Sequence, residues 1–117
     1  GIGSAPFAYR DLAVDADALT LSVKVRNAGD IAGEETVQVY LRDCVCEVMQ
    51  PVKQLIAFRK VLLQPGEEQE VTFQLDRTAF TYINRAEERV FAPGDFMLMA
   101  GHSAKDEDLL KETVWVG

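Results

Sequence analysis

Residues 19–30 decide the fold, and they read LTLSVKVRNAGD. From Leu19 to Arg26, apolar residues alternate with polar ones, which indicates a strand with one buried and one solvent-facing side. The NAGD that follows favours a turn, because asparagine, glycine and aspartate all tolerate turn dihedrals. The alternation returns in TVQVYLR at residues 36–42. We therefore expect the two runs to pair as antiparallel strands around a short connection.

The same kind of pattern extends through the rest of the chain. Further strands are expected over residues 7–14, 55–63, 71–75, 89–92, 96–100 and 114–116. Pro-Gly pairs at 65–66 and 93–94 predict tight reversals, the second of them between two paired strands. Asp76 is placed to cap a single helical turn through Phe80, because its carboxylate can accept the free amides there. Seven to eight short antiparallel strands without helical periodicity predict an all-β fold, a two-sheet β-sandwich.

Length and charge limit the possible function classes. The chain has 117 residues, enough for one domain with a core of its own. It carries 12 basic and 19 acidic residues, a net charge of −7, so we expect no nucleic-acid partner. Its apolar stretches are only a few residues long, so we expect a soluble domain with no membrane partner. The acidic residues are scattered, which is typical of a solvated surface.

The residues that usually carry catalysis or bind cofactors are sparse. Cys44, Cys46 and His102 are too few for a zinc site, which needs about four converging ligands. A serine-based triad would depend on His102, and no nucleophile elbow accompanies it. No glycine-rich phosphate loop follows a strand either, so we predict no catalytic residue, no metal and no cofactor. An acidic chain still holds many carboxylates, so an independent hydrolase acting through a carboxylate pair stays open as an alternative.

Aromatic residues offer another route to a function, because sugar-binding modules often stack exposed rings on sugar faces. The aromatic residues of this chain lie in or beside expected strands, where rings usually pack against their neighbours. Tyr40 and Trp115 are the candidate sugar-stacking residues, and Tyr40 lies on the polar side of its strand. A carbohydrate-binding or adhesion β-sandwich module is therefore kept as the alternative function.

Four groups of motifs occur together and in order along the chain. Residues 21–43 contain LSVKVRNAGD and GEETVQVYLRD, residues 51–61 read PVKQLIAFRKV, residues 63–73 contain LQPGEE and VTF, and residues 93–104 contain PGDF and GHSA. This series resembles the fibronectin type III-like domain at the C-terminus of glycoside hydrolase family 3 enzymes, the β-glucosidase family. The resemblance extends over nearly the whole chain. Gln50 and Ala57 depart from it, at positions where the family often has arginine and glycine.

The resemblance implies an immunoglobulin-like or fibronectin type III-like β-sandwich over residues 7–117, with residues 1–6 as a linker or a cloning remnant. It also implies a non-catalytic domain, because the family's aspartate nucleophile and glutamate acid/base belong to upstream domains and have no counterpart here. The parent protein is then a β-glucosidase that hydrolyses O-glycosyl bonds, and this domain packs on its catalytic domains and stabilises them. The absence of an initiating methionine agrees with a piece of a larger polypeptide.

The long connection between residues 43 and 53 is the expected contact with the catalytic domains of the same polypeptide. It carries apolar residues that a free surface does not explain. The predicted contact residues are Val45, Val48, Met49, Pro51 and Lys53. A second subunit is a further expected partner, and the compartment stays open between the bacterial periplasm and the cytoplasm.

Overall fold

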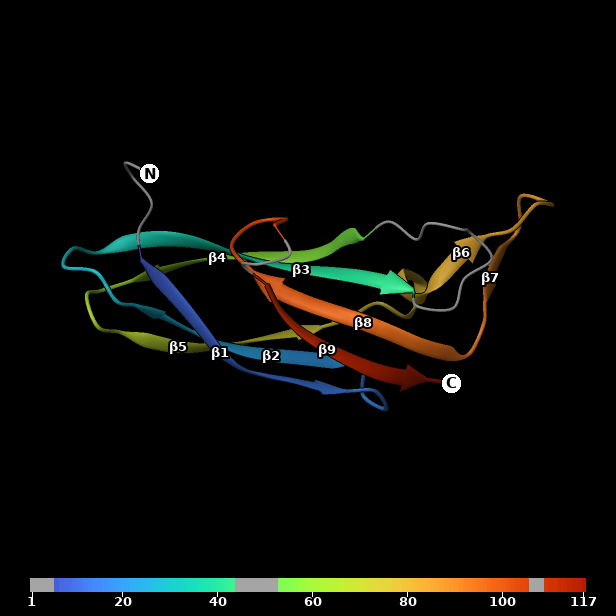
Figure 1. Ribbon diagram of the computed structural model, residues 1–117, viewed down its shortest axis with the longest axis horizontal. Helices are drawn as coiled ribbons and strands as arrows, with labels where there is room; N and C mark the ends of the chain where they lie inside the picture. The colour runs from blue at the N-terminus through green and yellow to red at the C-terminus, as the bar shows by residue number, and fades with distance from the viewer. Residues whose placement is uncertain (1–5, 44–52, 106–108) are drawn as a thin grey trace.

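Nine strands and one short helical turn form the part of the chain that the computed structural model describes, residues 6–43, 53–105 and 109–117 (Figure 1). The strands are β1 Phe7–Asp15, β2 Thr20–Asn27, β3 Gly33–Asp43, β4 Gln54–Leu63, β5 Glu68–Gln74, β6 Thr81–Ile83, β7 Arg89–Phe91, β8 Gly94–Gly101 and β9 Leu109–Val116. A 3₁₀ turn, η1, spans Arg77–Phe80 between β5 and β6. The all-β prediction is confirmed, and the strand number exceeds the expected seven to eight because β6, which was not expected, pairs with β7, which the sequence predicted over residues 89–92.

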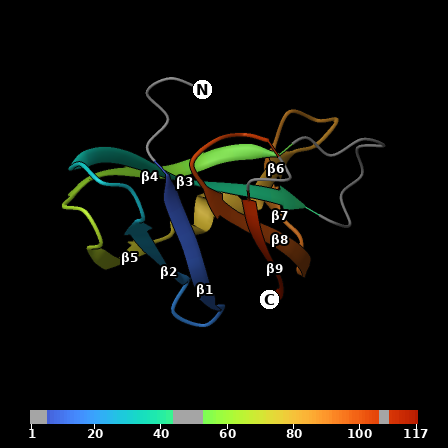
Figure 2. The same cartoon turned by 60° about the vertical axis from the view of Figure 1, so that its left-hand side comes forward.

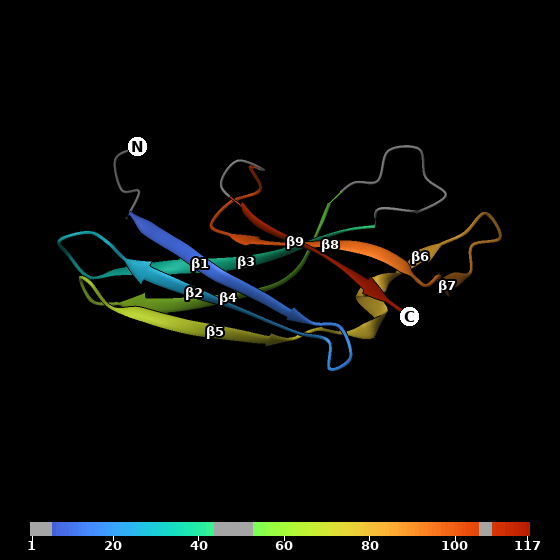
Figure 3. The same ribbon diagram turned by 60° about the horizontal axis from the view of Figure 1, so that its bottom comes forward.

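Seven of the strands build two antiparallel sheets that face each other as layers (Figures 1 and 2). The three-stranded sheet has the order β1-β2-β5, and the four-stranded sheet has the order β4-β3-β8-β9. β6 and β7 pair with each other at the end of the sandwich away from the start of β1 (Figures 1 and 3). The two-sheet sandwich expected from the sequence is therefore confirmed.

The core lies between the two sheets and is made of aliphatic and aromatic side chains. β2 shows the alternation that the sequence predicts: Leu21, Val23 and Val25 are fully buried, whereas Arg26 faces outward. The four-stranded sheet contributes inward-facing side chains to the same core. They include Val37, Val39, Leu41, Val61, Leu63, Phe96, Leu98 and Ala100. Burial of each such side chain contributes about 1.5–3 kcal/mol to folding, so the alternation itself specifies which face of each strand points inward.

The predicted helical turn closes one end of this core. Asp76 precedes η1, and its carboxylate accepts the Thr78 N–H at 2.9 Å. This contact confirms the predicted cap, which satisfies an amide that the short turn leaves without a partner. Phe80, the last residue of η1, is buried, and its ring meets the edge of Phe96 with centroids 5.1 Å apart and planes at 84°. The turn therefore fills the space where the two sheets diverge.

Asn27 is the buried polar residue around which three segments meet, and it is fully buried. Its Nδ2 donates to the carbonyls of Ile31 at 2.9 Å and Leu63 at 3.0 Å, and its Oδ1 accepts the Gly29 N–H at 2.9 Å. The turn at 64–67, which joins β4 to β5, is bound to its backbone. The Asn27 N–H donates to the Glu67 carbonyl at 2.9 Å, and the Asn27 carbonyl accepts the Gly66 N–H at 2.7 Å. The end of β2, the connection to β3 and the end of β4 are thus held together by one side chain and its backbone.

Two expected strand pairings are wrong. β2 pairs with β1 and β5, and β3 pairs with β4 and β8, so the connection after Asn27 crosses from one sheet to the other. β7 pairs with β6, and β8 pairs with β3 and β9, so these two consecutive strands do not form a hairpin either. Alternation marks one buried face of a strand, and two such strands bury that face equally well as partners in one sheet or across the core.

The reversal predicted at Pro65-Gly66 is confirmed, although it also joins strands of different sheets. The Glu67 N–H donates to the Gln64 carbonyl at 2.9 Å, which closes the turn. Gly66 has a φ of 78°, a left-handed conformation that a β-carbon disfavours. Glycine at this position is therefore required for the backbone path that brings the turn to Asn27.

We predict that Asn27→Ala lowers the free energy of unfolding by about 3 kcal/mol, because it leaves the buried carbonyl of Leu63, the part-buried carbonyl of Ile31 and the part-buried N–H of Gly29 without their partner. Urea denaturation of the chain measures this loss. Asn84→Ala is the matched control, since the side-chain oxygen of Asn84 accepts the exposed N–H groups of Ala86 and Glu88. Water replaces those contacts, so the control should lose less than about 1 kcal/mol. Equal losses in the two variants would contradict a structural role specific to Asn27.

Candidate interaction surfaces

The outer face of the three-stranded sheet is polar. Its outward positions alternate with the buried ones along β1, β2 and β5, and the cross-strand register brings Ala8, Arg26 and Glu68 into one row. The next row holds Arg10, Lys24 and Glu70. The large apolar side chains that are exposed elsewhere in the described residues do not lie on these three strands. This face therefore has the composition of a solvated surface.

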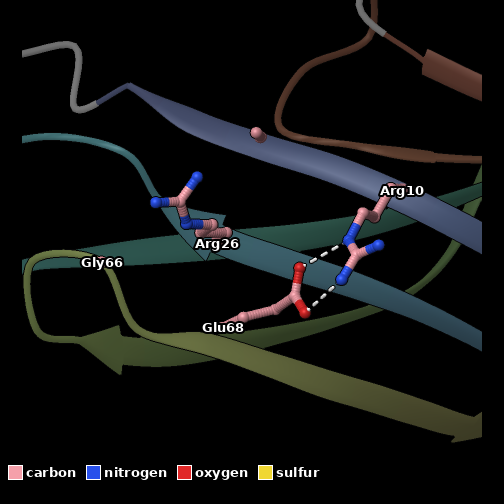
Figure 4. A pocket seen from close by; sticks show the side chains of 5 residues that line it. Arg10, Arg26, Gly66 and Glu68 are labelled. Carbon is pink, nitrogen blue, oxygen red and sulfur yellow. Dashed lines mark hydrogen bonds and ion pairs between the residues drawn. The ribbon is translucent and has the colours of Figure 1, made fainter.

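A shallow depression of about 440 Å³ lies on this polar face, lined by Ala8, Arg10, Arg26, Gly66 and Glu68 (Figure 4). Arg10 donates from Nε and from a terminal guanidinium nitrogen to the two carboxylate oxygens of Glu68, each at 2.7 Å. This paired hydrogen bond lowers the pKa of Glu68 below its usual range. Arg26 lines the same depression without touching the pair in Figure 4. The contact is exposed to solvent, so it contributes little to stability.

The outer face of the four-stranded sheet has an apolar centre. Tyr40 on β3 is 8% exposed and packs with the buried side chains of Met99 and Leu109. Its hydroxyl donates to Oε1 of Gln38, and Nζ of Lys53 lies 6.0 Å from the centroid of its ring. Of the predicted contact residues, Lys53 is therefore placed beside Tyr40. The burial of Tyr40 leaves little ring surface for a sugar, and this counts against its predicted stacking role.

The edge strand of that sheet, β4, exposes a row of large apolar side chains. Leu55, Phe58 and Leu62 are 51%, 63% and 64% exposed. Their register partners on β3 are Tyr40, Gln38 and Glu34, residues of the outer face, so the three side chains share that face. We call these three residues the β4 row. β4 pairs with β3 on one side and is the first strand in the sheet order, so none of the described strands lies along its other edge.

Trp115 lies on the same outer face but at the opposite edge of the sheet. It belongs to β9, pairs with Asp95 on β8, and is 62% exposed. A β-carbon added to Gly117 would come within 2.1 Å of the indole, so the ring lies directly against that glycine. Trp115, unlike Tyr40, thus presents a ring that a ligand or a partner could reach.

Four of the predicted contact residues, Val45, Val48, Met49 and Pro51, lie outside the described residues. The β4 row was not among the predicted contacts. Its signal is nevertheless present in the sequence: residues 55–63, LIAFRKVLL, place apolar side chains at both alternating positions of one strand. A strand that is apolar on both sides is typical of one that is covered on both faces.

A second hollow, of about 630 Å³, lies where the beginning of β4 meets η1 and the β6–β7 hairpin. It is lined by Gln54, Ile56, Asp76, Thr78, Ala79, Thr81, Tyr82, Ile83 and Arg89. Arg89 donates to the hydroxyl of Thr81 at 2.9 Å, and Asp76 is occupied as the cap of η1. These polar contacts lie within the hairpin and within η1, on one side of the hollow.

The described residues contain few chemical centres. Within residues 6–43, 53–105 and 109–117, no three histidine, cysteine, aspartate or glutamate side chains gather as they would around a metal ion. No helix in the same residues has the length and apolar character needed to cross a membrane. His102 is exposed at the end of β8. The pKa of Asp76, like that of Glu68, is lowered, here mainly by the hydrogen bond from the Thr78 backbone.

Comparison with known proteins gives consistent matches. A family model described as a fibronectin type III-like domain matches residues 35–104. Thermostable beta-glucosidase B of Acetivibrio thermocellus is 41% identical over 123 residues, covering 99% of this chain and 16% of that protein. Periplasmic beta-glucosidase of Salmonella typhimurium is 37% identical over 83 residues, covering 71% of this chain and 11% of that protein.

Solved structures agree with these sequence matches. A crystal structure of beta-glucosidase from Listeria innocua superposes with a TM-score of 0.84 and 39% identity, covering 97% of this chain and 16% of that one. The GH3 beta-glucosidase of Bifidobacterium adolescentis gives a TM-score of 0.84 and 30% identity, covering 97% of this chain and 17% of that one. The chain therefore spans between 11% and 17% of the length of these relatives.

We predict that Arg10→Ala raises the pKa of Glu68 toward its ordinary value, because both hydrogen bonds to the carboxylate are lost. A carboxyl group whose pKa is lower in the folded state stabilises the fold at pH values above its unfolded-state pKa. That stabilisation is lost as the pH falls through the folded-state pKa. The variant should therefore show a weaker acid dependence of unfolding between those two values. Carboxyl NMR titration measures the pKa. Arg26→Ala is the control, since Arg26 acts on Glu68 only through space, and an equal shift there would contradict the hydrogen-bond explanation.

Proposed function

The chain belongs to the fibronectin type III-like domain family, and we propose that it is the non-catalytic accessory domain of a β-glucosidase of glycoside hydrolase family 3. In this proposal the domain occupies residues 7–117 and residues 1–6 form the link to the preceding polypeptide. Its partners are the catalytic domains of the same polypeptide, and its task is to pack on them and stabilise them. The catalytic domains carry the hydrolysis of O-glycosyl bonds.

The contrast between the two outer faces of the sandwich is the observation that carries this proposal. One face is polar throughout its three strands, whereas the other presents the β4 row and Trp115 around the Tyr40 cluster. A free monomeric domain rarely exposes several large apolar side chains on one face. A domain that covers 16% of its relatives has the remaining polypeptide as the natural source of that cover.

The chemistry of the carboxyl groups agrees with a non-catalytic role. Hydrolysis of a glycosidic bond needs a general acid whose pKa is raised, paired with a second carboxylate across the scissile bond. Among the described residues, the pKa values of Glu68 and Asp76 are both lowered, and both residues are exposed. Each serves as a hydrogen-bond acceptor for a neighbouring group, which is a structural task.

The compartment and the quaternary structure follow from the parent polypeptide in this proposal. The relative from Salmonella typhimurium is named a periplasmic enzyme, and the periplasm is one of the two bacterial compartments expected here, with the cytoplasm as the other. A second subunit is a further expected partner. It would bind the full-length polypeptide, at faces of this domain that the catalytic domains leave uncovered.

We predict that the pure chain does not hydrolyse aryl β-glucosides, whereas the reading frame that continues upstream of Gly1 encodes catalytic domains that do. The comparison uses the chain alone and the full-length polypeptide at equal molar concentration, with release of the phenolate as the readout. The full-length protein is the positive control for the assay. Turnover by the pure chain, or an upstream frame without a glycoside hydrolase, would overturn the proposal.

A carbohydrate-binding or adhesion role is the second candidate, and the exposure of Trp115 is the observation that favours it. Under the first proposal, calorimetric titration of the chain with cello-oligosaccharides at millimolar concentration gives no heat of binding. Under the second, it gives heat that Trp115→Ala abolishes, because sugar stacking on an exposed ring supplies most of the binding. Tyr40→Phe is the control, since it keeps the buried ring and should leave any binding unchanged.

A further inference from the structure

We propose that the β4 row is the surface through which this domain docks on the catalytic domains, against a patch with an apolar centre and carboxylates beside it. The inference rests on the proposed function and adds to it the docking strand, its side chains and the chemistry of the complementary surface. The expected contact of residues 43–53 with the catalytic domains is kept beside it, since these residues directly precede β4 in the chain.

The apolar character of the row is the first argument. Leu55, Phe58 and Leu62 are each more than half exposed, and they project from one face of a single strand. At these exposures they present on the order of 300 Å² of apolar surface, the size at which a patch on a monomer is often functional. Phe58, which lies between the two leucines, is of a residue type enriched at the centre of protein interfaces.

The position of β4 is the second argument. It has ten residues and is an edge strand, and no strand in residues 6–43, 53–105 or 109–117 pairs with the N–H and carbonyl groups along its other side. Proteins protect such edges, because a long apolar edge strand pairs readily with other chains. Cover by another part of the same polypeptide protects both the backbone edge and the side chains of the row.

The charge of β4 indicates the chemistry of the occupant. From residue 53 to residue 63 the chain carries Lys53, Arg59 and Lys60 and no acidic residue, although the whole chain has a net charge of −7. Lys60 stands between Phe58 and Leu62 and pairs with Thr36 on the outer face. Two acidic residues lie across the register: Glu34 opposite Leu62 at the far end of the row, and Glu35 opposite Val61, where it accepts a hydrogen bond from the Tyr9 hydroxyl at 2.8 Å. Carboxylates on the partner would therefore complement the middle of the row.

The same charges argue against a second copy of this chain as the occupant. Two β4 strands paired edge to edge around the middle of the strand would bring Arg59 and Lys60 of both copies into one short stretch. Arg59 already lies over the ring of Phe73, 5.2 Å from its centroid, at the open side of the sandwich. Like charges placed this close disfavour association. The edge of β4 is therefore better suited to the catalytic domains than to a second copy of this chain.

Cysteine footprinting in the full-length polypeptide tests the inference. Phe58→Cys, in a chain with Cys44→Ser and Cys46→Ser, is labelled with a maleimide both in the isolated domain, which has its own core, and in the full-length protein. We expect labelling in the full-length protein to be slower by about 100-fold, because a docked side chain reacts only after local opening. Adding Lys60→Glu should raise the labelling rate of position 58 in the full-length protein about tenfold, because the reversed charge then faces carboxylates on the partner surface.

Ile31→Cys is the matched control, since Ile31 is 77% exposed in the loop between β2 and β3 and lies outside the row. Its labelling rate should be the same in the isolated and full-length proteins. Equal rates at position 58 in the two proteins would overturn the inference while the proposed function stands, because another face would then dock. Protection of position 58 that rises with the concentration of the isolated domain would overturn it in favour of a second copy. An upstream frame without catalytic domains would instead remove the proposed function itself.

Discussion

The hydrogen bonds of Asn27 are the constraint on which the arrangement of the domain depends. A fully buried amide must have its donors and acceptor satisfied, since each unpaired buried group costs about 1–3 kcal/mol. Asn27 meets this requirement only when the carbonyls of Ile31 and Leu63 and the N–H of Gly29 are all within reach. The loop that leaves β2 and the end of β4 are therefore positioned together, by one side chain.

The position of β4 at the sheet edge follows from that arrangement. The connection held by Asn27 carries the chain across the core, so β3 begins the opposite sheet instead of pairing with β2. β4 then pairs with β3, and the turn at 64–67 returns the chain to the first sheet as β5. With β8 on the other side of β3, β4 is the last strand at its end of the sheet in the part of the chain that the structure describes. The exposed row on β4 is thus a consequence of topology.

Much of the fold could be predicted from alternation and turn residues, because both are local properties. The buried side of β2, the reversal at Gly66 and the cap of η1 by Asp76 are all determined by neighbouring residues. Strand pairing could not be predicted in the same way, since a strand with one apolar side can bury it beside or across from the next. The motif resemblance identified the family, but the docking face required the register of β3 and β4, which shows where Phe58 points.

In an isolated β-sandwich of this kind, exposure to water costs more free energy on one outer face than on the other. On the three-stranded sheet, charged side chains such as Arg10 and Glu68 bind each other and water, so that face can remain exposed at little cost. On the four-stranded sheet, the β4 row adds apolar surface to an open backbone edge, and the combination favours association with any available chain. The proposed covalent linkage to catalytic domains would resolve this, because docking within one polypeptide occurs at high effective concentration and excludes competing chains. The features that make β4 a hazard in a free domain are therefore those that make it effective as an internal interface.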